Sequence, residues 1–246
     1  MPDTVKLFPL HVCSIKKQLM KTSTLFLIGS LISSSLCAQN LCTQDSALSE
    51  NTSFEISFYG SSNNLIEVSH FNITATFNTP DGRKAIIAQT NTDTTTTKKE
   101  KYYAIECNDA ALLINNKNII PAYVFEEFHN MDLDATSSSL SIPKELHVGQ
   151  KLSNADYKIE IEVTPIKHRL HYFLTDRIVT SKETINTPAG TFECYLIESK
   201  THMRPQNNNT GSVKQWFAED IGLIKQVDYN LEGAITGINL LTDLKF

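Results

Sequence analysis

The sequence lacks the local signatures that mark most enzyme active sites. No GxSxG motif places a serine on a sharp turn, and no glycine-rich loop could cradle a phosphate. Carboxylates are numerous but scattered, so the sequence fixes no pair at the separation that glycoside hydrolysis requires. We therefore predict no catalytic residue and no cofactor, and we expect a protein that is not an enzyme.

Long apolar runs are also missing. The run TLFLIGSLISSSL is too short and too rich in serine to span a bilayer, which takes roughly 20 mostly apolar residues. Lysines precede this run and small residues follow it at CAQN, which is the pattern of a secretory signal peptide. We predict that residues 1–38 are this signal, that cleavage follows Ala38, and that Met20 is the true initiator. No later segment is apolar enough to cross a membrane.

Positive charge is scarce in the predicted mature chain. Residues 1–38 hold four lysines and one aspartate, so the remaining 208 residues carry 18 basic and 26 acidic side chains, a net charge of −8. Nucleic acids and anionic lipid surfaces both call for clusters of lysine and arginine, so we predict neither as a partner. No repeat or composition shift divides residues 39–246, and we predict one domain there.

Cysteines are few and widely separated after residue 38. Cys42, Cys107 and Cys194 allow one disulfide and one free thiol in an oxidising compartment, and their spacing leaves all three pairings open. A zinc site usually has paired ligands a few residues apart, so we predict no metal site. Cys37 and Cys42 each follow a leucine, whereas a lipid-attachment signal needs a small residue there.

Alternation of apolar and polar residues dominates the rest of the chain. FNITATF (71–77) and YKIEIEV (157–163) alternate with a period of two, and FECYLIE, SVKQWFA and AITGINLL do the same. Turn residues recur between such runs, at TPDG, HVGQ, TPAG and LEG. The pattern predicts an all-β fold, an antiparallel curved sheet or barrel-like domain. One short helix is expected from Pro121, in PAYVFEEFHNM.

Three groups of residues invite a functional interpretation. His168 and His171 have the spacing of a metal pair, but a strand would point them to opposite faces. Glu219 and Asp220 form an acidic pair, which we interpret as a turn between two strands. Trp216 and Phe217 come just before this turn, and we expect them to point to opposite faces of their strand, so that only one of them belongs to the main core. The third group is a set of phenylalanines that could line an apolar cavity or simply fill the core: Phe54, Phe58, Phe71, Phe77, Phe173 and Phe217.

The C-terminal half resembles the TapB-like exported bacterial proteins, which carry a domain of unknown function. The shared motifs are P-x-x-L-x-V-G at residues 143–149, TPAGTFxCY at 187–195 and W-[YF]-A-x-x-[IV]-G at 216–222. The resemblance implies an all-β protein of the cell envelope, and it implies no activity. Many relatives have a methionine-rich strand after the VG turn, whereas this chain has KIEIEVTPIKHRLHYF, so a soft-metal role does not transfer.

These observations predict an exported protein, periplasmic, associated with the outer membrane or extracellular. We expect a non-enzymatic binding module whose partner is an envelope protein or a small apolar molecule. Two alternatives stay open. One is a hydrolase that cleaves an envelope polymer with carboxylates brought together by the fold, and the other is a structural or adhesive surface component.

Overall fold

A computed structural model describes nine stretches of the chain, residues 48–91, 100–108, 110–114, 119–128, 132–138, 140–163, 166–204, 210–219 and 221–246. All of them belong to one compact unit, Gln39–Phe246. The predicted signal peptide, Asp220 and most of the polar stretch 91–101 lie outside the described residues, so the predictions made for them stay predictions.

The described residues form the strands that the alternation predicted and the short helix that was expected after Pro121. The helix is α1 (Ala122–Glu127), which begins directly after Pro121. The strands are β1 (Ser53–Gly60), β2 (Leu65–Thr79), β3 (Gly82–Asn91), β4 (Lys101–Asn108), β5 (Ala111–Ile114), β6 (Asp132–Ser138), β7 (Leu140–Pro143), β8 (Ala155–Val163), β9 (Ile166–Thr187), β10 (Gly190–Arg204), β11 (Thr210–Ala218), β12 (Gly222–Tyr229) and β13 (Ile235–Lys245).

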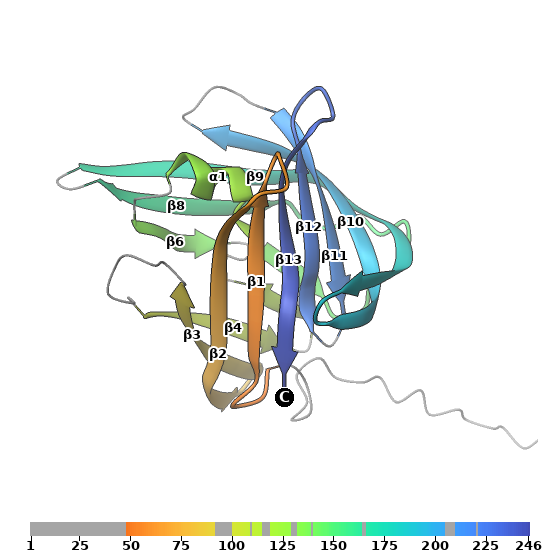
Figure 1. Cartoon of the computed structure of the whole chain (residues 1–246). Coiled ribbons are helices and arrows are strands. Elements are labelled where there is room, and N and C mark those ends of the chain that lie inside the picture. Colours follow the sequence, from red (N-terminus) through yellow and green to blue (C-terminus); the bar gives the residue numbers. More distant parts are fainter. Residues whose placement is uncertain are drawn as a thin grey trace, which may run out of the picture. The chain divides into compact units, whose positions relative to one another are not determined.

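The strands form one antiparallel sheet that curls into a nearly closed barrel (Figure 1). The spatial order is β6-β8-β9-β10-β11-β12-β13-β1-β2-β3-β4-β5-β7. The first and last strands of this order, β6 and β7, are separated in the chain by residue 139 alone. The chain therefore passes directly from one edge of the sheet to the other, and the predicted fold class is confirmed.

A short stretch that begins with the edge strand β7 connects this edge of the sheet to β9 and helps to close the barrel. We call residues 140–153 the closing segment. Its first part, β7, pairs with β5, and its later part bonds to β9 through Gly149 N to Val179 O (2.8 Å), Val179 N to Gln150 O (2.9 Å) and Leu152 N to Arg177 O (2.9 Å). The motif P-x-x-L-x-V-G lies in this segment, where Leu146 is buried and Gly149 has a φ of +88°. The motif is thus part of the barrel closure.

Helix α1 packs against β13, β1 and β2 (Figure 1). Ile119 and Ile120, which precede it, are fully buried. A Cβ added to Gly237 of β13 would lie 2.8 Å from the Cβ of Ala122, so only glycine permits this close approach. The helix is therefore seated tightly on the strands that form one side of the barrel.

A β-bulge changes which residues of β2 face the core. Phe71 and Ile73 are buried, as the alternation predicts, but the register with β3 shifts between Ile73 and Ala75. One extra residue in a strand sends the following side chains to the other face. Phe77 is consequently 54% exposed, and the prediction that it shares a buried face with Phe71 is wrong.

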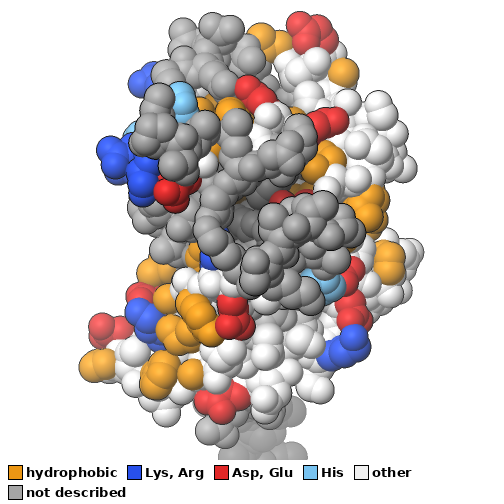
Figure 2. Space-filling model, turned by 60° about the vertical axis from the view of Figure 1, so that its left-hand side comes forward, with side chains coloured by type: hydrophobic (Ala, Val, Ile, Leu, Met, Phe, Trp, Pro, Cys, Tyr) orange, Lys and Arg blue, Asp and Glu red, His pale blue; other side chains and the backbone are white. Residues whose placement is uncertain are grey.

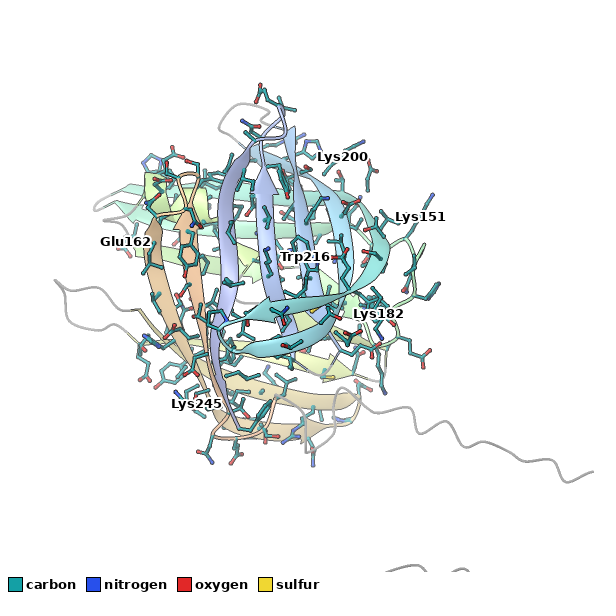
Figure 3. The ribbon with its side chains drawn as sticks, turned by 45° about the vertical axis from the view of Figure 1, so that its right-hand side comes forward. Lys151, Glu162, Lys182, Lys200, Trp216 and Lys245 are labelled. Carbon is teal, nitrogen blue, oxygen red and sulfur yellow. The ribbon has the colours of Figure 1, made fainter. Side chains whose placement is uncertain are left out.

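The outer face of β11 is covered as well. Trp216 is 8% exposed and Phe217 is 1% exposed, although neighbouring residues of a strand point to opposite faces. Figure 3 shows the end of β9 and the start of β10 crossing over the neighbouring strands beside Trp216, and the Trp216 Nε1 donates to Glu183 Oε2 of β9 at 3.1 Å. The prediction that only one of the two aromatic residues joins the core is therefore wrong, because this hairpin supplies a second buried layer.

The surface in Figure 2 carries both signs of charge side by side and a group of hydrophobic side chains at its lower left. Ion pairs join charges of opposite sign at the surface, for example Lys84 with Glu106 and Lys167 with Glu160. Within the described part of the chain, no helix has the length and apolarity needed to cross a membrane.

Candidate functional site in the barrel interior

Polar side chains gather on the inner face of β11 and β12, where apolar residues would be expected. Gln215, Gln226 and Asp228 are all buried, and the hydroxyl of Tyr172 on β9 reaches the same place. Gln215 Nε2 donates to Gln226 Oε1 at 2.8 Å, and Gln226 Nε2 donates to Asp228 Oδ2 at 3.0 Å. Tyr172 also donates to Asp228 Oδ1, at 3.3 Å. We call these four residues the Asp228 cluster.

Burial controls the ionisation of the Asp228 cluster. Removal from water raises the pKa of Asp228 to about 7, although the hydrogen bonds from Gln226 and Tyr172 act in the opposite direction. Burial also raises the pKa of the Tyr172 hydroxyl, and the nearby Asp228 adds to that shift. The pKa of Tyr123 on α1 is raised by burial first and by Asp228 second, which places the helix close to this carboxyl. The cluster is therefore a hydrogen-bonded group that holds at most one charge at neutral pH.

The same face of the barrel fixes the chain that leads into α1. Gln226 Nε2 donates to the carbonyl oxygen of Ile119 at 3.0 Å, and Asn239 Nδ2 donates to that of Ile120 at 3.0 Å. A buried carbonyl without a partner is costly, so these amides satisfy a segment that belongs to no strand. One role of the Asp228 cluster is thus structural, because it anchors the helix on the inner face.

Arg177 is the second polar feature of the interior, and its side chain is incompletely bonded. It lies in β9 next to Asp176, which has a φ of +52°, where the register with β10 shifts. Its Nη1 donates to the carbonyl oxygens of Ser153 at 2.7 Å and Ser141 at 3.4 Å, which lie in the closing segment. Its Nε and Nη2 are buried and have no hydrogen-bond partner among the residues that the structure describes.

The surroundings of Arg177 disfavour its charge. The residue is 2% exposed, and removal from water lowers the pKa of its guanidinium to about 10, while Tyr157 acts in the opposite direction. Ser199 of β10 lies opposite this bulge and is also buried, and within the described part of the chain its Oγ has no hydrogen-bond partner. Buried donors are rarely left unpaired in folded proteins, so the unused hydrogen-bonding capacity of Arg177 and Ser199 is an uncommon feature of this interior.

The residues singled out in the sequence do not converge on this site. His168 is exposed, and His171 lies 3.8 Å from Asp156 Oδ1 and stacks on Phe173, so the two histidines do not meet. Glu219 is exposed at the turn between β11 and β12. Among the described residues, no group of three histidine, cysteine, aspartate or glutamate side chains could hold a metal ion.

The phenylalanines divide between the interior and the surface. Phe58, Phe71 and Phe217 are buried, and Phe54 stacks on Phe71 with ring centroids 4.8 Å apart. Phe77 is exposed, and Phe173 lies beside His171, with Arg204 over its ring at 5.6 Å. The set therefore does not line one cavity, because bulges and strand direction send two of its members outward.

The cysteines that the structure describes have different states. Cys107 is disulfide-bonded, and Cys194 is a buried free thiol. Burial raises the pKa of the Cys194 thiol to about 12, so it is not a reactive nucleophile at neutral pH. Cys42 lies outside the described residues, and its part in a disulfide stays a prediction.

Sequence reasoning missed both Arg177 and the Asp228 cluster. In LIKQVDY the apolar Leu223 and Val227 suggest that the odd-numbered positions face inward, whereas Gln226 and Asp228 are the ones that reach Tyr172 and the α1 segment inside the barrel. A signal for Arg177 exists in LTDRIVT, where Asp-Arg interrupts an apolar alternation, as a bulge does.

Two solved structures have the same fold. The first is a presumed exported protein with a YmcC-like fold from Bacteroides fragilis NCTC 9343, with a TM-score of 0.69, 17% identity, and coverage of 80% of this chain and 96% of that chain. The second is a presumed lipoprotein from Parabacteroides distasonis ATCC 8503, with a TM-score of 0.64, 20% identity and the same coverage. At these identities the likeness shows the fold alone. No curated protein matches the sequence.

A family comparison reaches further, because it matches sequence over most of the barrel. The DUF3108-like pattern matches residues 49–241, which run from just before β1 into β13. This range contains the closing segment, Arg177 and the whole Asp228 cluster. The chain therefore belongs to the DUF3108-like family.

Proposed function

We propose that this protein is an exported, non-enzymatic protein of the cell envelope that binds a small, mainly apolar ligand inside its barrel. The observation that carries the proposal is the unused hydrogen-bonding capacity of the interior. Arg177 Nε and Nη2 and Ser199 Oγ are buried without hydrogen-bond partners in the described ranges of the chain, in a wall that is otherwise largely apolar. Ligand sites typically combine apolar walls with a few polar groups that orient the ligand.

Export is supported by the leader-like residues 1–38 and by the two structural relatives, which are described as an exported protein and a lipoprotein. Within the DUF3108-like family, we place the chain with the TapB-like proteins because it shares their three motifs. Each motif has a position in the fold: 143–149 in the closing segment, 187–195 in the β9–β10 hairpin, and 216–222 in the β11–β12 hairpin.

The geometry favours binding over hydrolysis of an envelope polymer. A hydrolase of that kind needs two carboxyls across a cleft, at least one with a raised pKa. Among the described residues, Asp228 is the one carboxyl whose pKa is raised, and its oxygens are occupied by Gln226 and Tyr172. The other shifted carboxyls have lowered pKa values: Glu160, Asp176, Glu183 and Asp243.

Native mass spectrometry of the protein purified from its envelope tests the proposal. We expect a species heavier than the bare chain, and organic extraction should release the bound molecule. The variant Ser199→Leu should lose that molecule because it adds a larger side chain beside Arg177, whereas Thr191→Leu, at an exposed position of the same strand, should keep it. A wild-type protein that is always free of ligand would contradict the proposal.

A further inference from the structure

We propose that the ligand carries a single carboxylate on an apolar chain, as a fatty acid does, and that this carboxylate pairs with the Nε and Nη2 groups of Arg177. The inference rests on the proposed function, because it names the head group of the ligand that the barrel would hold. It follows from the bonding, the charge and the place of Arg177 in the fold.

The hydrogen bonds that Arg177 makes to described residues leave unused the edge of its guanidinium that can bind a carboxylate. A guanidinium is planar, and its Nε and Nη2 hydrogens point the same way, so this edge can donate two parallel bonds to the two oxygens of a carboxylate. Among the described residues, the guanidinium donates only through Nη1, to Ser153 O and Ser141 O. A residue that served only to hold the closing segment would need Nη1 alone, and the burial of two further donors would bring no benefit.

The charge of Arg177 selects a monoanion. None of the ion pairs in the described part of the chain includes Arg177, and the residue is 2% exposed. A buried charge is strongly disfavoured unless a counter-charge accompanies it. A carboxylate would neutralise the site, whereas the second charge of a phosphate monoester would stay uncompensated in these apolar surroundings.

The surrounding wall suits an apolar chain. Ile159 of β8 and Leu170 and Leu174 of β9 are buried on the inner face, on either side of Tyr172. Along β9, Leu174 lies between Arg177 and Tyr172 of the Asp228 cluster, and Leu170, with Ile159 opposite it on β8, lies beyond Tyr172. A ligand whose carboxylate is held by Arg177 would therefore extend its apolar chain along a hydrophobic stretch of wall.

The closing segment offers a route to the buried guanidinium. Long strand ladders form most of the barrel, but the described bonds between β9 and residues 149–152 are three backbone hydrogen bonds and the Lys151–Ile178 bridge. Arg177 lies directly under this short connection and bonds to both ends of the closing segment. Opening there would expose the Nε and Nη2 edge while the strand ladders stay intact.

The test compares three probes that share one chain: hexadecanoate, hexadecanol and hexadecyl phosphate, each titrated into the purified full-length mature protein. We expect hexadecanoate to bind most tightly. Arg177→Gln should weaken the binding of hexadecanoate roughly tenfold to a hundredfold, as loss of a charged hydrogen-bonded pair does. The same variant should leave the affinity for hexadecanol unchanged. Arg169→Gln is the matched control on the same strand, because its side chain is 74% exposed.

The outcomes separate this inference from the proposed function. Equal binding of hexadecanol and hexadecanoate to the wild type would overturn the carboxylate pairing while supporting an apolar ligand. Tighter binding of hexadecyl phosphate with the same dependence on Arg177 would overturn the assignment of a carboxylate. If no probe binds and native mass spectrometry finds no ligand, the proposed function itself fails.

A measurement on the wild type does not depend on the folding of Arg177→Gln, which lacks the hydrogen bonds from Arg177 Nη1 to Ser153 and Ser141. Carbon NMR of hexadecanoate labelled in its carboxyl group reports the ionisation of the bound ligand. A neighbouring guanidinium favours the charged form, so we expect the bound carboxyl to titrate at a lower pH than hexadecanoate dispersed with a neutral detergent. A carboxyl that titrates at the same or a higher pH when bound would overturn the pairing.

Discussion

At the scale of single residues, Asp228 makes folding sensitive to pH in an uncommon direction. Its pKa rises from a usual value of 3.8 to about 7 on folding, because burial disfavours the carboxylate more than Gln226 and Tyr172 stabilise it. Between these two values the folded chain holds a proton that the unfolded chain has released. The stability contributed by Asp228 is therefore fully present below pH about 4 and is lost as the pH rises to about 7.

The variant Asp228→Asn should remove this pH dependence. Asparagine stays neutral at every pH. The variant should therefore keep the stability that the wild type loses between pH about 4 and about 7, which is about 4 kcal/mol for a pKa shift of this size. Urea unfolding of both proteins at a series of pH values measures the difference. Asp243→Asn on β13 is the control, because the Asp243 side chain is partly exposed and its pKa is lowered. A variant with the wild-type slope would show that Asp228 is ionised throughout.

The cysteines support a second prediction at this scale. Cys107 is disulfide-bonded and Cys194 is a free thiol, and Cys42 is the third cysteine of the predicted mature chain. We expect peptide mapping without reduction to recover Cys42 linked to Cys107. Alkylation of the native protein should leave Cys194 unmodified, because its thiol is buried and its pKa is raised to about 12, whereas unfolding should expose one thiol per chain. Rapid labelling of the native protein would contradict this state.

At the scale of elements, the contact between α1 and β13 depends on the absence of one side chain. The variant Gly237→Ala should cost about 1 to 3 kcal/mol of stability, because its Cβ would lie 2.8 Å from the Cβ of Ala122. Adding Ala122→Gly should recover most of that loss, since it removes the opposing atom. Chemical denaturation of both single variants and the double variant measures the coupling, and simple addition of the two losses would show that the contact does not matter.

The strands themselves could be predicted from the sequence, but which of their side chains face the core could not always be predicted. Alternation in YKIEIEV correctly places Tyr157, Ile159 and Ile161 in the core, because β8 pairs without a bulge to β9. A bulge leaves at most a local break in the alternation, as Asp-Arg does in LTDRIVT, and FNITATF has no such break although the bulge in β2 sent Phe77 outward. Arg177 was missed for the same reason, and Asp228 was missed because the polar interior depends on tertiary partners such as Ile119 and Tyr172.

At the scale of the whole molecule, export is the first property to be tested. Residues 1–38 have the charge and length pattern of a signal peptide, with cleavage expected after Ala38. We expect the protein recovered from the envelope of an expressing bacterium to begin at Gln39, as intact mass and N-terminal sequencing would show. Ala38→Asp should block this processing, because the cleavage site requires a small residue. A mature protein that retains residues 1–38 would contradict the prediction.

The continuous sheet also predicts that residues 39–246 unfold as one unit. Leu146 is buried in the closing segment, whereas Trp216, the only tryptophan, lies in β11. Leu146→Ala should cost about 2 to 5 kcal/mol, because it leaves a cavity at a buried site. In a single cooperative unit, the unfolding transitions followed by Trp216 fluorescence and by far-ultraviolet circular dichroism must both move to the same lower midpoint. A dichroism transition that moves while the Trp216 transition stays in place would show that the barrel consists of two units.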